Sequence, residues 1–77
     1  VLNMKKFPYC PTRAEIKRIV YLCHQRQSQC RVGQAVGNQF ELPKEIDGRI
    51  YQNSNFDSVV DILYHHYHRS EYQNELI

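Results

Sequence analysis

Residues 12–23 read TRAEIKRIVYLC, and this stretch of sequence decides the fold class. Thr12 and Glu15 have the T-x-x-E spacing of a capping box, in which both residues satisfy N–H groups left free at the start of a helix. Apolar side chains then recur at the spacing of one helix face: Ile16, Ile19, Val20 and Cys23. The stretch therefore predicts a helix over residues 13–27 that buries this stripe.

Two more helices are predicted by the residues downstream. Residues 31–40, RVGQAVGNQF, place their apolar side chains along one side of a short helix. Pro43 favours the end of this helix, because the residue before a proline avoids helical conformation. Asn and Ser at residues 53–55 offer caps for a third helix over residues 55–68. Its apolar face consists of Phe56, Val59, Val60, Leu63 and Tyr67.

The connections between these helices complete the predicted architecture. Residues 43–53 are typical of a loop, with a turn at Asp47-Gly48. We expect an irregular lead-in at residues 1–11 and a polar tail at residues 70–77. A chain of 77 residues has room for one domain with a thin core. The sequence therefore predicts an all-α fold: a compact three-helix domain with a longer irregular loop between its second and third helices.

The cysteines and the hydropathy of the chain indicate its compartment. An odd number of cysteines leaves at least one unpaired in a monomer, and Cys10, Cys23 and Cys30 form no C-x-x-C pair. No stretch approaches the roughly 18 apolar residues that cross a bilayer. We therefore expect a soluble protein of the reducing cytoplasm, without a membrane partner.

The second predicted helix carries two glycines and a polar face. Gly33 and Gly37 each cost about 1 kcal/mol relative to alanine inside a helix, so we expect another helix or loop to pack closely against them. Arg31, Gln34 and Asn38 share a different face. Two interpretations remain open for these three side chains. They form either a hydrogen-bond network that holds the 43–53 loop, or a recognition surface for base edges or peptide backbone.

The same segment carries a resemblance to other proteins. The pattern Arg-x-Gly-Gln with an Asn four residues after the Gln, here Arg31, Gly33, Gln34 and Asn38, resembles one in small bacterial and phage proteins without an assigned activity. The resemblance spans about residues 16–67 and includes the closing helix rich in acids and aromatics. It implies a similar fold and a bacterial or phage origin, and it implies no activity.

The tyrosines suggest a surface for a protein partner. The chain has six, more than a core of this size buries. Tyr21 falls on the outer side of the first helix and Tyr64 at the edge of the third. Tyrosine and arginine are enriched at protein interfaces. We therefore expect binding through Tyr21, Tyr64, Arg31, Gln34 and Asn38, although half-buried packing of the tyrosines is the alternative.

The charges support a second function class. Residues 1–40 hold seven Lys and Arg against one carboxylate, whereas residues 41–77 hold three against seven. Arg13, Lys17 and Arg18 form a basic face on the first helix that would follow a phosphate backbone. The short break between the first two helices also has the spacing of a helix-turn-helix. Neutralisation between packed helices, or self-association of the two halves, is an open alternative.

The sequence gives little support for a catalytic function or a metal site. No G-x-S-x-G, H-E-x-x-H or phosphate-binding glycine loop occurs. Asp61, His65 and His68 have spacing that suits a weak metal site, but the favoured interpretation is a solvated helix face with an Asp61–His65 pair. We expect a small non-enzymatic binding protein with no cofactor and no metal, which acts on a protein partner or on a second copy. The alternative is a nucleic-acid-binding regulator.

Overall fold

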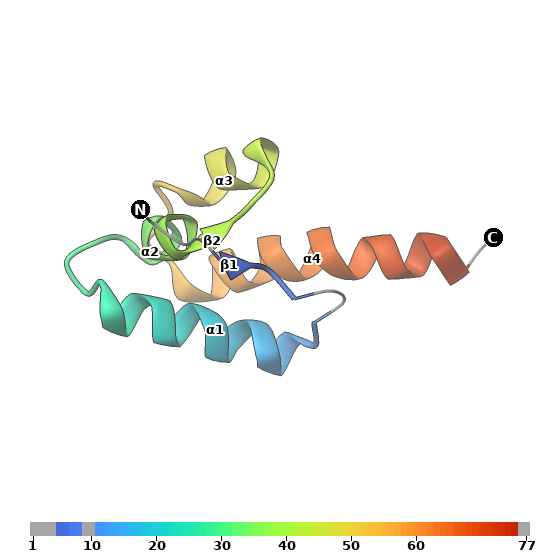
Figure 1. Cartoon of the computed structure of the whole chain (residues 1–77), viewed down its shortest axis with the longest axis horizontal. Helices are drawn as coiled ribbons and strands as arrows, with labels where there is room; N and C mark the ends of the chain where they lie inside the picture. Colours follow the sequence, from blue (N-terminus) through green and yellow to red (C-terminus); the bar gives the residue numbers. More distant parts are fainter. Residues whose placement is uncertain (1–4, 9–10, 76–77) are drawn as a thin grey trace.

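The computed structural model describes residues 5–8 and 11–75, with side chains described as far as Tyr67. Figure 1 shows the order of elements in this part of the chain. They are β1 (Lys5–Lys6), α1 (Arg13–Arg26), α2 (Val32–Gln39), β2 (Phe40–Glu41), α3 (Lys44–Ile50) and α4 (Phe56–Glu75). The prediction of an all-α three-helix domain was therefore wrong, because the described residues form four helices and a small two-stranded sheet.

Helix α1 confirms the prediction made from residues 12–23. The side-chain hydroxyl of Thr12 accepts a hydrogen bond from the Glu15 N–H at 3.1 Å, and the Glu15 carboxylate accepts one from the Thr12 N–H at 3.0 Å. Ile16, Val20 and Cys23 are buried, and Ile19 is half-buried. The helix ends at Arg26, where the sequence predicted an end near residue 27.

Helix α3 occupies the segment that the sequence predicted to be a loop. Ile46 and Ile50 lie one helical turn apart and are both buried in the core, at 3% and 0% exposure. The Asp47-Gly48 dipeptide lies inside this helix and forms no turn. Burial of two isoleucines on one helix face outweighs the local preference of Asp-Gly for a turn.

The glycines of α2 allow α3 to pack closely, as the sequence predicted. A Cβ atom added at Gly33 would lie 1.5 Å from the carbonyl oxygen of Ile50, and one added at Gly37 would lie 2.4 Å from the Asp47 Oδ1 atom. The Gly33 N–H also donates a hydrogen bond to the Asn53 carbonyl at 2.9 Å. The backbones of α2 and of the segment ending α3 are therefore in direct contact.

The sheet was missed at the sequence level. β1 pairs in parallel with β2, with Lys5 opposite Phe40 and Lys6 opposite Glu41. Residues 5–6 therefore belong to a strand where an irregular lead-in was expected, and Phe40 leaves the helix in which it was predicted. Phe40 has an extended backbone with ψ of 145°, and its N–H donates to the Val36 carbonyl and closes α2.

Aromatic rings hold the segment after β1 against the rest of the fold. The Phe7 ring stacks on the Tyr67 ring with centroids 4.5 Å apart, and it meets the Phe40 ring edge-on at 5.4 Å. Burial raises the pKa of the Tyr67 phenol above its ordinary value. The N-terminal segment is thereby joined both to the sheet and to α4.

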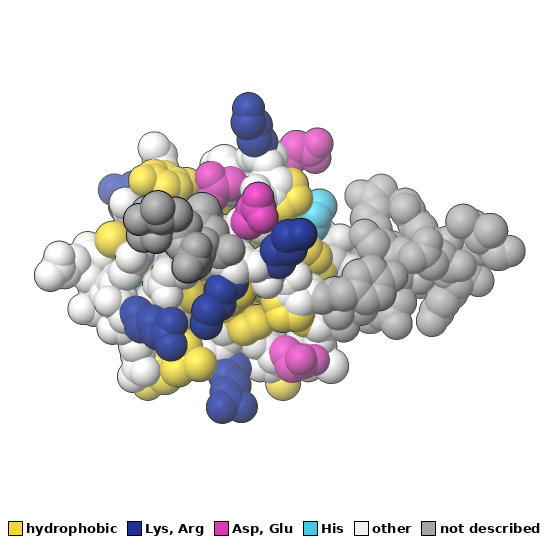
Figure 2. All heavy atoms as spheres, viewed as in Figure 1, with side chains coloured by type: hydrophobic (Ala, Val, Ile, Leu, Met, Phe, Trp, Pro, Cys, Tyr) yellow, Lys and Arg dark blue, Asp and Glu magenta, His cyan; other side chains and the backbone are white. Residues whose placement is uncertain are grey.

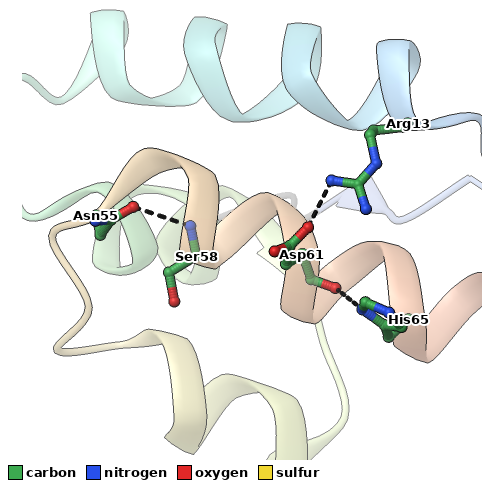
Figure 3. Close-up of polar contacts among 5 residues, drawn as sticks. All are labelled: Arg13, Asn55, Ser58, Asp61 and His65. Carbon is green, nitrogen blue, oxygen red and sulfur yellow. Dashed lines mark hydrogen bonds and ion pairs between the residues drawn. The ribbon is translucent and has the colours of Figure 1, made fainter.

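Helix α4 begins where the sequence predicted and continues further. Asn55 Oδ1 accepts a hydrogen bond from the Ser58 N–H at 3.0 Å, which confirms a cap from the residues before this helix (Figure 3). Val59, Val60 and Leu63 are fully buried. The helix extends to Glu75, whereas the sequence predicted an end near residue 68 and a polar tail from residue 70. Its C-terminal part runs past the other helices (Figure 1).

The core lies between α1, α2, α3 and the first half of α4. Its buried apolar side chains are Ile16, Val20, Cys23, Val32, Ala35, Val36, Ile46, Ile50, Val59, Val60 and Leu63. None of the helices in the described part of the chain combines the length and apolar composition that a membrane crossing needs.

Candidate protein-binding surface

The polar trio of α2 is divided between two neighbours. The Gln34 Nε2 atom donates to the Tyr51 hydroxyl at 3.3 Å, at the end of α3. The Asn38 Nδ2 atom donates instead to the Gln27 Oε1 atom at 3.1 Å, just after α1. Arg31 is exposed at the start of α2 and makes no side-chain cap. The two amides therefore link α2 to the elements on either side of it.

Gln39 is a polar contact that the sequence did not reveal. Its Nε2 atom donates to the carbonyl oxygen of Cys23 at 2.8 Å and to that of Ala35 at 3.2 Å. The first bond ties the end of α2 to the last turns of α1. A glutamine after an apolar stripe gives no local signal of such a bond, because the acceptor comes from another helix.

Arg13 joins the start of α1 to the middle of α4. Its guanidinium forms an ion pair with the Asp61 carboxylate (Figure 3), and its CZ atom lies 4.6 Å from the centroid of the Tyr64 ring. Both side chains of the ion pair are partly exposed. The hydrogen bond from Arg13 holds the pKa of Asp61 below its ordinary value. Desolvation opposes this lowering, and the positive charges of Arg13 and Lys17 add to it. Arg13 and Tyr64 thus contribute to helix packing.

This ion pair predicts a pH-dependent stability. The folded chain holds a proton on Asp61 less tightly than the unfolded chain does, because its pKa is lowered on folding. The stabilisation is therefore present above the unfolded-state pKa of about 3.9 and is lost as the pH falls through the lower folded value. We expect Asp61→Asn to lower the thermal unfolding midpoint slightly near pH ~7 and to have no effect in strong acid, below the folded-state pKa.

Thermal unfolding followed by circular dichroism checks this expectation. Glu41→Gln is the control, since Glu41 is exposed and has no ion pair among the described residues. A difference between Asp61→Asn and wild type that stays constant with pH would contradict the role given to the ion pair.

Asp61 and His65, the described members of the acid–histidine group on α4, do not direct their side chains toward a common site. The Asp61 carboxylate faces Arg13, while the His65 Nδ1 atom lies 2.8 Å from the main-chain carbonyl oxygen of Asp61 (Figure 3). The side chain of His68 lies outside the described residues. Within those residues no group of three or more His, Cys, Asp or Glu is placed to hold a metal ion.

The outward side of α1 carries the most distinctive exposed surface. We call it the α1 outer surface and define it as Lys17, Arg18, Tyr21, Leu22, Gln25 and Arg26, all of which are exposed. Tyr21 is 55% exposed and Leu22 is 42% exposed, which is high for large apolar side chains. The Gln25 Nε2 atom donates to the Tyr21 hydroxyl at 2.9 Å and orients the ring.

Leu22 is the residue of this surface that sequence reasoning missed. The apolar stripe of the helix comprises Ile16, Ile19, Val20 and Cys23. Leu22 is apolar but falls outside this stripe, so helical geometry turns it away from the core. An apolar residue off the buried face of an amphipathic helix was the signal available for it.

Positive charge surrounds this part of the molecule. Figure 2 shows Lys and Arg side chains gathered over α1 and β1, with hydrophobic side chains between them and most acidic side chains of this face nearer α3. Burial raises the pKa of the Cys23 thiol, and the nearby charges of Arg26 and Lys5 oppose that rise. Lys5, one of the two cations of β1, therefore acts on the same thiol as Arg26 of α1.

Known proteins add no family or fold assignment to this geometry. The chain matched none of the protein-family models, curated proteins or solved structures with which it was compared.

Proposed function

We propose that the chain is a small non-enzymatic binding protein of the bacterial or phage cytoplasm, which acts as an accessory or inhibitor by docking on another protein through the α1 outer surface. One observation carries the proposal. Tyr21 and Leu22 are exposed side by side on α1, away from the core. Tyrosine and arginine are enriched among the residues that dominate binding energy at protein interfaces, and the exposed leucine beside them adds apolar contact area.

The other residues expected to bind contribute less to this proposal. Gln34 and Asn38 are hydrogen-bonded within the chain, and Tyr64 lies beneath the Arg13 guanidinium. Gln34 and Asn38 would have to exchange those contacts to meet a partner. The Leu22 side chain and the Tyr21 ring already face solvent, and the Tyr21 hydroxyl is bonded to Gln25 of the same surface. Arg31 is exposed but lies at the N-cap of α2, so we assign it no part in the α1 outer surface.

A nucleic-acid-binding role is the second candidate, and the exposed cations favour it. Lys17 and Arg18 are exposed on α1, and Lys5 and Lys6 are exposed on β1. Arg13 is bound to Asp61, which removes one of the three cations first expected to contact phosphate. The amides of α2 that would read bases are hydrogen-bonded within the chain.

A pull-down with matched variants tests the two candidates together. The full chain is immobilised and exposed to a bacterial lysate, with and without nuclease and at low and high salt. The test variant carries Tyr21→Ser and Leu22→Ser, and the control carries Tyr51→Ser. Tyr51 is a suitable control because it is 42% exposed and lies at the end of α3. Circular dichroism establishes that all three proteins are folded.

We expect wild type and the Tyr51→Ser control to capture one discrete protein from the lysate. This capture should persist after nuclease treatment and at high salt, and it should be lost with the double variant. Capture that disappears with nuclease, or that falls steeply with salt, would replace this proposal by the nucleic-acid role. Capture that is unchanged in the double variant would show that α1 is not the binding surface.

A further inference from the structure

The α1 outer surface has a regular order of charge along the helix. Lys17 and Arg18 lie one turn before Tyr21 and Leu22, and Arg26 lies one turn after them. The only carboxylate of α1 is Glu15, whose Oε1 atom accepts the Thr12 N–H in the capping box. The apolar pair is therefore flanked by cations along the helix, with no acidic side chain between them.

These cations form no ion pair in the described part of the chain, although Lys17 is near enough to Asp61 to help lower the pKa of that carboxyl. The ion pair found there is that of Arg13 with Asp61. Lys17, Arg18 and Arg26 are exposed and form none within the same residues. Because like charges on one surface repel, carboxylates supplied by another molecule would relieve this repulsion and would fix the orientation of that molecule.

We infer that the partner docking on the α1 outer surface presents an acidic segment with one large apolar side chain, whose carboxylates meet the cations on either side of Tyr21 and Leu22. This inference rests on the proposed function and adds to it the chemistry of the partner. Charge complementarity selects the partner and speeds its association, while Leu22 and Tyr21 supply the apolar contact.

Other occupants fit these residues less well. A second copy that docked through the same surface about a two-fold axis would bring the cations of one copy against the cations of the other. Leu22 would add no binding energy to a contact with a phosphate backbone. A membrane surface needs a broad apolar helix face, and the apolar stripe of α1 faces the core, which leaves only Tyr21 and Leu22 for insertion.

Selection from a random peptide library tests the inference without a known partner. A library of peptides about 12 residues long is selected on the immobilised full chain, because that length spans the three turns of the surface. We expect the enriched peptides to carry an excess of Asp and Glu together with Leu, Ile, Phe, Tyr or Trp. A labelled copy of the most enriched peptide then gives affinities by fluorescence polarisation.

Charge reversal on matched helices supplies the control. Lys17→Glu with Arg18→Glu should weaken binding of that peptide by at least about 10-fold. Lys44→Glu with Arg49→Glu reverses two exposed cations on α3 and should change it by less than about 2-fold. Unchanged circular dichroism in both variants separates loss of binding from loss of fold.

Neutral or basic enriched peptides would overturn the inference, as would the absence of enrichment or an equal loss in the α3 control. The inference would also fail if a single-stranded oligonucleotide or anionic lipid vesicles bound more tightly than the selected peptide. It would fail as well if the free protein formed larger oligomers as its concentration rose. If lysate capture depends on Tyr21 and Leu22 while the selected peptides are not acidic, the proposed function stands and this inference fails. If lysate capture does not depend on those two residues, the proposed function itself fails.

Discussion

Replacement of Gly33 by alanine is expected to lower the free energy of unfolding by about 3 kcal/mol or more. The new Cβ atom would lie 1.5 Å from the carbonyl oxygen of Ile50 and 2.4 Å from its carbonyl carbon. Backbone atoms cannot rotate away as a side chain does, so α2 and α3 would have to separate. Separation would also break the hydrogen bond from the Gly33 N–H to the Asn53 carbonyl.

The size of the chain makes this loss severe. A domain below about 80 residues has only about 3–5 kcal/mol of stability from a single core. We therefore expect Gly33→Ala to be largely unfolded in the absence of a stabilising solute. The measurement is urea denaturation followed by circular dichroism, with the thermal midpoint as a second readout.

The other two glycines provide internal controls. A Cβ atom at Gly37 would meet Oδ1 of Asp47, the end of a side chain that can rotate, and one at Gly48 would meet nothing within 4 Å. Gly37→Ala should change stability by about 1 kcal/mol or less in either direction, and Gly48→Ala should stabilise α3 by up to about 1 kcal/mol. An equal loss in all three variants would contradict the close approach assigned to Gly33.

Ile50→Ala is expected to destabilise the fold by about 2–5 kcal/mol. The Ile50 side chain is fully buried, so truncation removes apolar contacts and leaves a cavity between α3 and the rest of the core. The variant tests whether the seven-residue helix α3 is part of the core. A surface loop, which the sequence predicted here, would tolerate the same change.

The adjacent exposed residue serves as the comparison. Arg49→Ala leaves the core untouched and should stay within about 0.5 kcal/mol of wild type. Chemical denaturation of both variants gives the difference. If Ile50→Ala lost no more stability than Arg49→Ala, α3 would not be packed as the structure describes.

Helices α1 and α4 could be predicted from the sequence because their signals are local. The capping box at Thr12 and the asparagine before α4 each act within three or four residues, and each apolar stripe lies on one helix. Helix α3 was missed because its Asp-Gly pair favours a turn. The spacing of Ile46 and Ile50 was present in the sequence, but its meaning depends on burial against other helices.

The sheet and the contacts of α1 could not be predicted, because they join distant residues. No pattern at Lys5–Lys6 indicates pairing with Phe40–Glu41, and strands of two residues leave almost no periodicity. The partner of Arg13 lies 48 residues away in the sequence. The exposure of Tyr21 followed from its helical position, whereas pairing Arg13 with Asp61 required the crossing of α1 and α4.

The contact of Phe7 with Phe40 and Tyr67 also has a consequence for biosynthesis. Phe7 leaves the ribosome before either of the rings that it contacts in the finished fold. The Phe7 ring therefore cannot make these contacts until α2 and then most of α4 have been synthesised. Contacts between residues far apart in sequence form late, because closing a long loop opposes them. The segment around Phe7 is made before the elements that it contacts but docks after them, and until then its aromatic side chain is open to chaperones and proteases.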